Sequence, residues 1–141
     1  MRVMETIQSA KARENWAKTF DNVFFKGPAL IQKNDRVNLF MSGPHMNVWL
    51  RQQFPLEYTF AKEDGVHMVS LTGIPDIFGY GDTITEAGHD LAEHLKVLTE
   101  EMYEDFERFA TQRPHDIPYL LQLSMMQTQQ FEQLIAVTAD G

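Results

Sequence analysis

Hydrophobic and polar positions over residues 2–54 predict a strand, a helix, a hairpin and a short helix, in that order. Residues 2–7 alternate with the period of a strand, and a helix with Ser9 as its N-cap follows to Lys26. Gly27-Pro28 ends this helix, because glycine accepts the left-handed C′ conformation and proline cannot continue a helix. We expect the core and a dimer interface to be formed by Trp16, Phe20, Phe24, Leu39 and Met41.

A hairpin follows this helix, with strands at residues 28–34 and 36–42. They are joined at Asn34-Asp35, residue types that favour tight turns. Residues 45–54 predict a short helix before Pro55. One face of the second strand is predicted to be buried, with Val37, Leu39 and Met41.

From residue 56 the period of two returns and predicts a second hairpin. Residues 56–60 alternate as a strand does, and residues 62–65 form a polar turn. The return strand covers residues 66–72 and a third, irregular strand lies near residues 77–81. The region therefore predicts a small antiparallel sheet.

Two helices complete the predicted elements. Thr83 and Glu86 form a capping box, in which the threonine caps a helix and Glu86 bonds back to the Thr83 amide. The apolar stripe of this helix implies about 28 residues and roughly 40 Å. We therefore expect its last turns to contact a partner subunit, another chain or the C-terminal segment. Pro118 begins a second helix that runs to about Val137, with glutamines such as Gln122 interrupting its apolar face.

Composition and charge indicate a folded protein with two unlike parts. Apolar residues make up 43% and charged residues 23%, which is typical of globular proteins. Residues 1–55 hold eight basic and four acidic residues, a net charge of +4, whereas residues 56–141 hold four basic and sixteen acidic residues, a net charge of −12. This charge difference favours a protein that binds a polyanion with its first part and a basic protein with its second. The alternative is two solvated surfaces without charged partners.

Several function classes have no support in the sequence. There is no cysteine, which excludes disulfides, thiolate metal sites and cysteine nucleophiles. His89 and His94 are five residues apart and lie on different faces of their helix, so we predict no metal site. We also predict no cofactor and no catalytic residue. No run approaches the roughly 18 apolar residues of a membrane span, and no signal peptide is evident, so we expect a cytoplasmic protein without membrane contact.

The first 54 residues resemble the Phd/YefM family of antitoxins. The resemblance lies in residues 7–15, which lead a strand into a Ser-x-x-Ala-Arg-x-Asn helix start, in residues 27–34, and in residues 37–42. It implies a β-α-β-β-α domain that dimerises and presents a basic surface to the operator of its own operon. By resemblance the DNA-contacting residues are Arg13 and Lys33. Charge and predicted exposure add two more, Lys11 and Arg36.

Residues 56–109 are similar to the HicB-like antitoxin domain. Its marks are the strand 57–60, the turn 63–65, the segment 70–76, and above all Gly81-Asp82-Thr83 with Glu86-Ala87 at the start of the helix. We therefore predict an α+β fold: residues 1–54 form the Phd/YefM-like dimerisation and DNA-binding domain. Residues 55–141 form an acidic, HicB-like partner-binding domain, a small antiparallel sheet with a long helix and a C-terminal helix.

The resemblances and the charge split lead to one functional hypothesis. The chain is an antitoxin of a type II toxin–antitoxin system that neutralises a basic, RelE-type ribonuclease and represses its own operon as a homodimer or higher even oligomer. The alternative is a non-catalytic structural or ligand-sensing homodimer that has lost DNA binding, and an enzyme is the weakest option. We expect the toxin to contact Glu100, Glu101, Glu104, Phe106, Phe109, Leu121 and Phe131.

Overall fold

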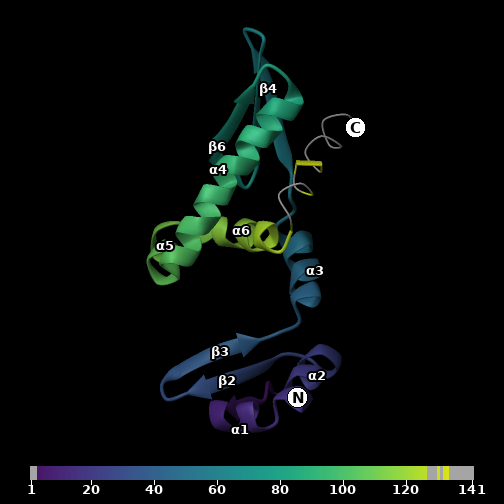
Figure 1. Cartoon of the computed structure of the whole chain (residues 1–141), viewed down its shortest axis with the longest axis vertical. Coiled ribbons are helices and arrows are strands. Elements are labelled where there is room, and N and C mark those ends of the chain that lie inside the picture. The colour runs from purple at the N-terminus through teal and green to yellow at the C-terminus, as the bar shows by residue number, and fades with distance from the viewer. Residues whose placement is uncertain (1–2, 127–129, 131, 134–141) are drawn as a thin grey trace. The chain divides into compact units, whose positions relative to one another are not determined.

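The computed structural model describes residues 3–126, 130, 132 and 133, and the chain forms two compact units (Figure 1). They are Met1–Trp49 and Leu50–Gly141, and the division falls within α3 (Gly43–Gln53). Each unit combines helices with a three-stranded sheet, so the predicted α+β fold is confirmed. The assignment of one part to DNA and of the other to a protein partner stays a prediction.

The first unit has a mixed sheet with strand order β1-β2-β3. β1 runs parallel to β2, and β2 runs antiparallel to β3. The predicted turn is present, because Lys33 pairs with Arg36 and Asn34 has a φ of 55°. The elements of this unit before α3 are β1 (Thr6–Gln8), α1 (Ser9–Glu14), α2 (Trp16–Lys26), β2 (Ala29–Lys33) and β3 (Arg36–Phe40).

The predicted first helix is divided at Asn15, which has a φ of −116° and a ψ of 41°. The Asn15 side chain donates to the Lys11 carbonyl oxygen at 3.4 Å, and such local bonds compete with the helical ladder. Ser9 is the first helical residue, not the N-cap. Gln8 occupies the N-cap position without a side-chain bond. β1 is also shorter than the predicted strand, and α3 starts two residues earlier than predicted.

The buried face of these helices differs from the predicted one. Ala12, Thr19 and Val23 are buried, whereas Trp16 and Phe20 are about half exposed. Small side chains let a helix approach a sheet closely. The large rings of Trp16 and Phe20 therefore lie at the edge of the contact between helix and sheet. There the ring of Trp16 stacks on that of Phe40 with centroids 5.4 Å apart. The other predicted core residues that prove to be exposed are Phe24, Val37 and Leu39.

The second unit has an antiparallel sheet with strand order β4-β5-β6. β4 (Tyr58–Glu63) and β5 (Val66–Leu71) form the predicted hairpin. Asp64 and Gly65 have φ values of 52° and 80°, and a type I′ turn requires positive φ at both positions. β6 (Ile74–Gly81) starts earlier than the predicted third strand.

α4 (Ile84–Glu104) begins as predicted and ends early. The Thr83 hydroxyl accepts a hydrogen bond from the Glu86 amide at 3.1 Å, which confirms the cap. The Glu86 carboxylate bonds the Asp82 amide rather than that of Thr83. The predicted helix of about 28 residues is wrong, because Asp105 leaves the helical region and its carboxylate accepts from the Arg108 amide. A new helix, α5 (Phe106–Gln112), starts there and packs against α4 instead of extending its axis.

The chain then crosses α4 through a short 3-10 helix, η1 (Pro114–Asp116), and α6 (Ile117–Ser124). Gln122, predicted to interrupt an apolar face, is 1% exposed. Its Nε2 donates to the carbonyl oxygens of Phe54 at 2.8 Å and Pro118 at 3.2 Å. Gln122 therefore ties α6 to the residues that follow α3. α6 ends at Ser124, and most of its predicted continuation to Val137 lies outside the described residues.

One hydrophobic core organises the second unit. α4 lies on β5 and β6 and supplies Leu91, Leu95 and Met102, each of which is at most 1% exposed. Arg113 adds a polar tie between β6 and η1. Its guanidinium binds both carboxylate oxygens of Asp76, at 3.1 and 3.0 Å, and also binds Asp116. Burial acts against the charge of Arg113, but these two carboxylates outweigh it and raise the pKa of the guanidinium.

The hydroxyl of Tyr58 makes the second unit sensitive to alkali. Burial raises the pKa of this partly buried group above its ordinary value of 10.0. Above about pH 10 the unfolded chain ionises Tyr58 while the folded chain keeps the hydroxyl neutral. Ionisation of this group therefore leaves the free energy of unfolding unchanged below that pH and lowers it above that pH. We expect the urea midpoint to fall between about pH 9 and 11, and to fall less in Tyr58→Phe. Parallel decreases in both proteins would contradict this.

Candidate functional site

The parallel register of β1 on β2 brings α1 to the hairpin turn. Gln8, the last residue of β1, pairs with Gln32, one residue before the end of β2. Because α1 starts at Ser9, its first turn lies beside the end of the hairpin, and α1 also packs against β2. Figure 1 shows α1 next to the β2–β3 hairpin. Two segments about 20 residues apart in the chain thus meet at one end of the sheet.

The four predicted DNA-contacting residues lie on these two segments, and all are exposed. Lys11 and Arg13 flank the buried Ala12 on α1, and Lys33 and Arg36 face each other across the hairpin. Within the described part of the chain none of the four makes an ion pair, so their charges are available to an anionic ligand. Two acidic residues, Glu14 and Asp35, lie among them in the sequence.

A groove of about 630 Å³ adds two basic residues that the sequence analysis did not single out. Lys18 and Lys26 line it together with Lys11 and residues 3–7. These lysines alternate with Asn15 and Asn22 at intervals of three and four, a polar stripe along α1 and α2. The same spacing is visible in the sequence and could have identified them.

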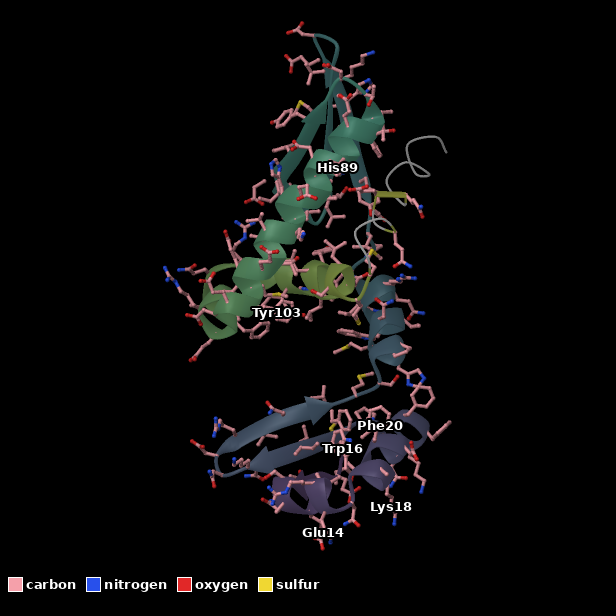
Figure 2. The ribbon with its side chains drawn as sticks, in the orientation of Figure 1. Glu14, Trp16, Lys18, Phe20, His89 and Tyr103 are labelled. Atoms are coloured by element: carbon pink, nitrogen blue, oxygen red, sulfur yellow. The ribbon has the colours of Figure 1, made fainter. Side chains whose placement is uncertain are left out.

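Trp16 and Phe20 project from the opposite side of α2 to Lys18 (Figure 2). They are 50% and 53% exposed, and their ring centroids are 6.0 Å apart. On β3, Val37 and Leu39 are also about half exposed. The first unit therefore carries a polar, basic side and separate apolar surface that no described residue covers.

The predicted toxin-contacting residues are partly separated by the fold. Glu100, Glu101 and Glu104 are exposed on the last turns of α4, and Phe106 is 49% exposed at the start of α5. Phe109 is 6% exposed and belongs to the core, so its side chain is not on the surface as the prediction expected, and its contact with a toxin stays a prediction. Leu121 is only partly buried and packs against the core, and Phe131 lies outside the described residues.

Two exposed apolar residues near these carboxylates were missed by the sequence analysis. Tyr103 is 60% exposed on α4 (Figure 2), and Val97, two turns earlier, is 52% exposed. Neither belongs to the apolar stripe that predicted this helix, so the periodicity gave no signal for them. With Phe106 they give the acidic end of α4 the apolar groups that an anchor requires.

His89 and His94 have structural partners. Nδ1 of His89 lies 2.7 Å from a carboxylate oxygen of Glu132, and Nδ1 of His94 lies 2.8 Å from the Phe78 carbonyl oxygen. No group of three potential metal ligands occurs in the described part of the chain. None of its helices has the length and apolar character of a membrane span.

Comparisons with known proteins agree with one another. Residues 1–138 match the PHD_like family, described as "Antitoxin of toxin-antitoxin, RelE / RelB, TA system". The solved structure of an antitoxin part of a toxin/antitoxin system from Syntrophomonas wolfei subsp. wolfei is similar, with a TM-score of 0.73 and 26% identity. The similarity covers 92% of this chain and 95% of that chain. No curated protein matches the sequence.

Proposed function

Because the chain belongs to the PHD_like family of toxin–antitoxin antitoxins, we propose that it binds operator DNA with its first unit and a basic toxin with its second. The first unit would act as the Phd/YefM-like part, and the second as the HicB-like part. Binding to the operator would repress the chain's own operon. An antitoxin of this kind acts by binding, so we assign no catalytic residue and no cofactor.

The observation that carries the DNA proposal is that α1, with Lys11 and Arg13, starts beside the hairpin turn that carries Lys33 and Arg36. Contacts between cationic side chains and phosphates release counterions and supply most non-specific affinity. The unit as a whole supports this, since residues 1–49 hold seven basic and four acidic residues, a net charge of +3. Lys18 and Lys26 in the groove would extend the phosphate-binding surface.

Dimerisation is proposed on the exposed apolar surface of the first unit. Trp16, Phe20 and Phe24 are 43–53% exposed on α2, and Phe25 is 78% exposed. Monomeric proteins seldom leave so many large apolar side chains together in water. A dimer would cover this surface and double the number of phosphate contacts, leaving the basic side of α2 free.

The toxin is proposed to bind the second unit through opposite charge. Residues 50–141 hold five basic and sixteen acidic residues, a net charge of −11. Charge complementarity speeds association and selects the partner, while buried aromatic groups supply affinity. We assign the electrostatic role to Glu100, Glu101 and Glu104. The buried aromatic groups of the complex would be Tyr103 and Phe106. The fitting partner is a basic, RelE-type ribonuclease.

The wild-type chain allows a direct test. We expect it to shift the mobility of a DNA fragment from upstream of its own reading frame, with about a thousandfold loss of affinity between 50 and 200 mM salt if about six phosphates are contacted. We also expect it to co-elute with the small basic protein encoded in the adjacent reading frame and to suppress that protein's toxicity. A chain that neither shifts the fragment nor binds the neighbour would overturn the proposal.

The alternative function is a ligand-sensing homodimer, and the feature that best supports it is a groove in the second unit. It lies between β4, β5 and the start of α4, and its volume is about 230 Å³. Sites for small molecules usually measure about 300–1,000 Å³. The groove is therefore small for a ligand, and we favour the antitoxin function. Loss of DNA binding with a stable dimer would support the alternative.

A further inference from the structure

The two edges of the second sheet differ in what they offer to another chain. On β6, the Tyr80 amide donates to the Asp90 carboxylate at 2.9 Å, and the Phe78 carbonyl oxygen contacts the His94 ring at 2.8 Å. Asp90 and His94 are one turn apart on α4, and Nε2 of His94 lies 3.6 Å from Oδ1 of Asp90. An added strand would need the same two backbone groups, so α4 closes this edge against strand pairing.

Among the described residues, no strand pairs with the middle of the outer edge of β4. The Glu57 carbonyl oxygen accepts from the Thr72 amide at 2.7 Å, so the odd-numbered residues of this strand direct their backbone groups toward β5. The backbone N–H and C=O groups of Phe60 and Lys62 therefore point away from the sheet. Within the part of the chain that the structure describes, neither residue has another hydrogen-bond partner there.

An apolar groove lies beside this open edge. Phe60 and Val69 line it from the sheet, and Ile84 and Ala87 line it from the start of α4. Lys62 is also part of its lining. Strand addition gains affinity from main-chain hydrogen bonds and specificity from pockets for alternate side chains. An open edge and a groove of about 230 Å³, enough for one side chain, occur together here.

We propose that the edge of β4 binds an extended, basic segment of the toxin, which places one apolar side chain in this groove. This inference rests on the proposed antitoxin function and specifies where part of the toxin binds. Charge selects the occupant, because Glu57, Glu63 and Asp64 lie at the two ends of the strand in a unit of net charge −11. Lysine or arginine residues on either side of the apolar residue would face these carboxylates.

A second copy of this chain is the less favourable occupant. Residues opposite each other in an antiparallel pair have the same hydrogen-bonding direction, so two β4 strands centred on their outward-facing residues would place Phe60 opposite Phe60 of the other copy. The same register brings Glu57 of one copy opposite Glu63 of the other at both ends. Like charges facing each other across a pair are destabilising, and two units of net charge −11 repel each other at longer range.

The experiment compares two variants at one exposed position. Lys62→Pro removes the outward N–H and places the proline ring in the path of an added strand. It keeps the ladder to β5, since proline is tolerated on edge strands. Lys62→Ala is the matched control, because it removes the same charge and keeps the N–H. The probe is the basic protein from the adjacent reading frame, titrated onto the full chain.

We expect Lys62→Pro to weaken the complex at least about tenfold and Lys62→Ala to change it less than about threefold, with equal urea midpoints in the free state. In the wild-type complex, the amides of Phe60 and Lys62 should become protected from hydrogen exchange, which tests the site without any substitution. Equal binding by all three proteins, without this protection, overturns the inference and leaves the antitoxin function intact. If Lys62→Pro changes only the oligomeric state of the chain, the edge of β4 binds a second copy, and the inference is overturned as well. If the wild-type chain does not bind the probe, both the function and the inference fail.

Discussion

Gly79→Ala should destabilise the second unit by about 3 kcal/mol or more, a large fraction of the stability of a small domain. Gly79 is a buried residue of β6 directly under α4. A Cβ atom there would lie 2.1 Å from the Ala87 carbonyl oxygen and 2.4 Å from the Leu91 amide nitrogen. These are backbone atoms of the helix, so no rotamer change can relieve the clash. α4 would have to move away from the sheet.

Urea unfolding followed by circular dichroism at the helix band measures this effect. Gly43→Ala is the control, because its added Cβ meets no atom within 4 Å and Gly43 is helical, so we expect unchanged or slightly higher stability. Displacement of α4 would also remove Asp90 and His94 from the edge of β6. A Gly79→Ala protein as stable as the wild type would mean that α4 does not pack on β6 at this point.

The double substitution Lys33→Ala and Arg36→Ala should lower operator affinity by about a hundredfold near 0.1 M salt and make its salt dependence shallower. Both side chains are exposed beside the hairpin turn and make no ion pair within the described residues. If each contacts one phosphate, a dimer loses about four contacts, which reduces the slope of log K against log salt by about 3.6. Fluorescence anisotropy with labelled operator DNA at several salt concentrations measures both quantities.

The matched control removes two positive charges from the acidic unit instead. Lys62→Ala with Lys96→Ala changes the net charge of the chain equally, so a difference between the two double variants comes from location. Thermal unfolding should be nearly unchanged in both, because substitutions of exposed residues usually alter stability by less than about 0.5 kcal/mol. Equal operator affinity in the two double variants would refute the assignment of the DNA surface to the hairpin.

Local signals in the sequence predicted the position of most elements. The two-residue turn at Asn34, the hairpin around Gly65 and the cap at Thr83 all depend on residues within four positions of one another, and all are present. The predicted helices were wrong at two positions where a polar side chain bonds the backbone of a residue three or four positions away. Asn15 divides the first helix and Asp105 divides the long one, and a hydrophobic stripe passes through both positions without a sign of the break.

The sequence by itself determined the charge difference between the two parts of the chain, because net charge needs no structure. It also placed Lys33 and Arg36 at a turn. Only the tertiary structure decided that α1 lies beside this turn and that Phe109 is buried while Trp16 is half exposed. It also decided that α4 closes the edge of β6, whereas no described residue pairs with the middle of the outer edge of β4. The physical reason is range: caps, turns and periodicity arise from neighbours in the chain, whereas exposure and free edges depend on which distant segments pair and pack.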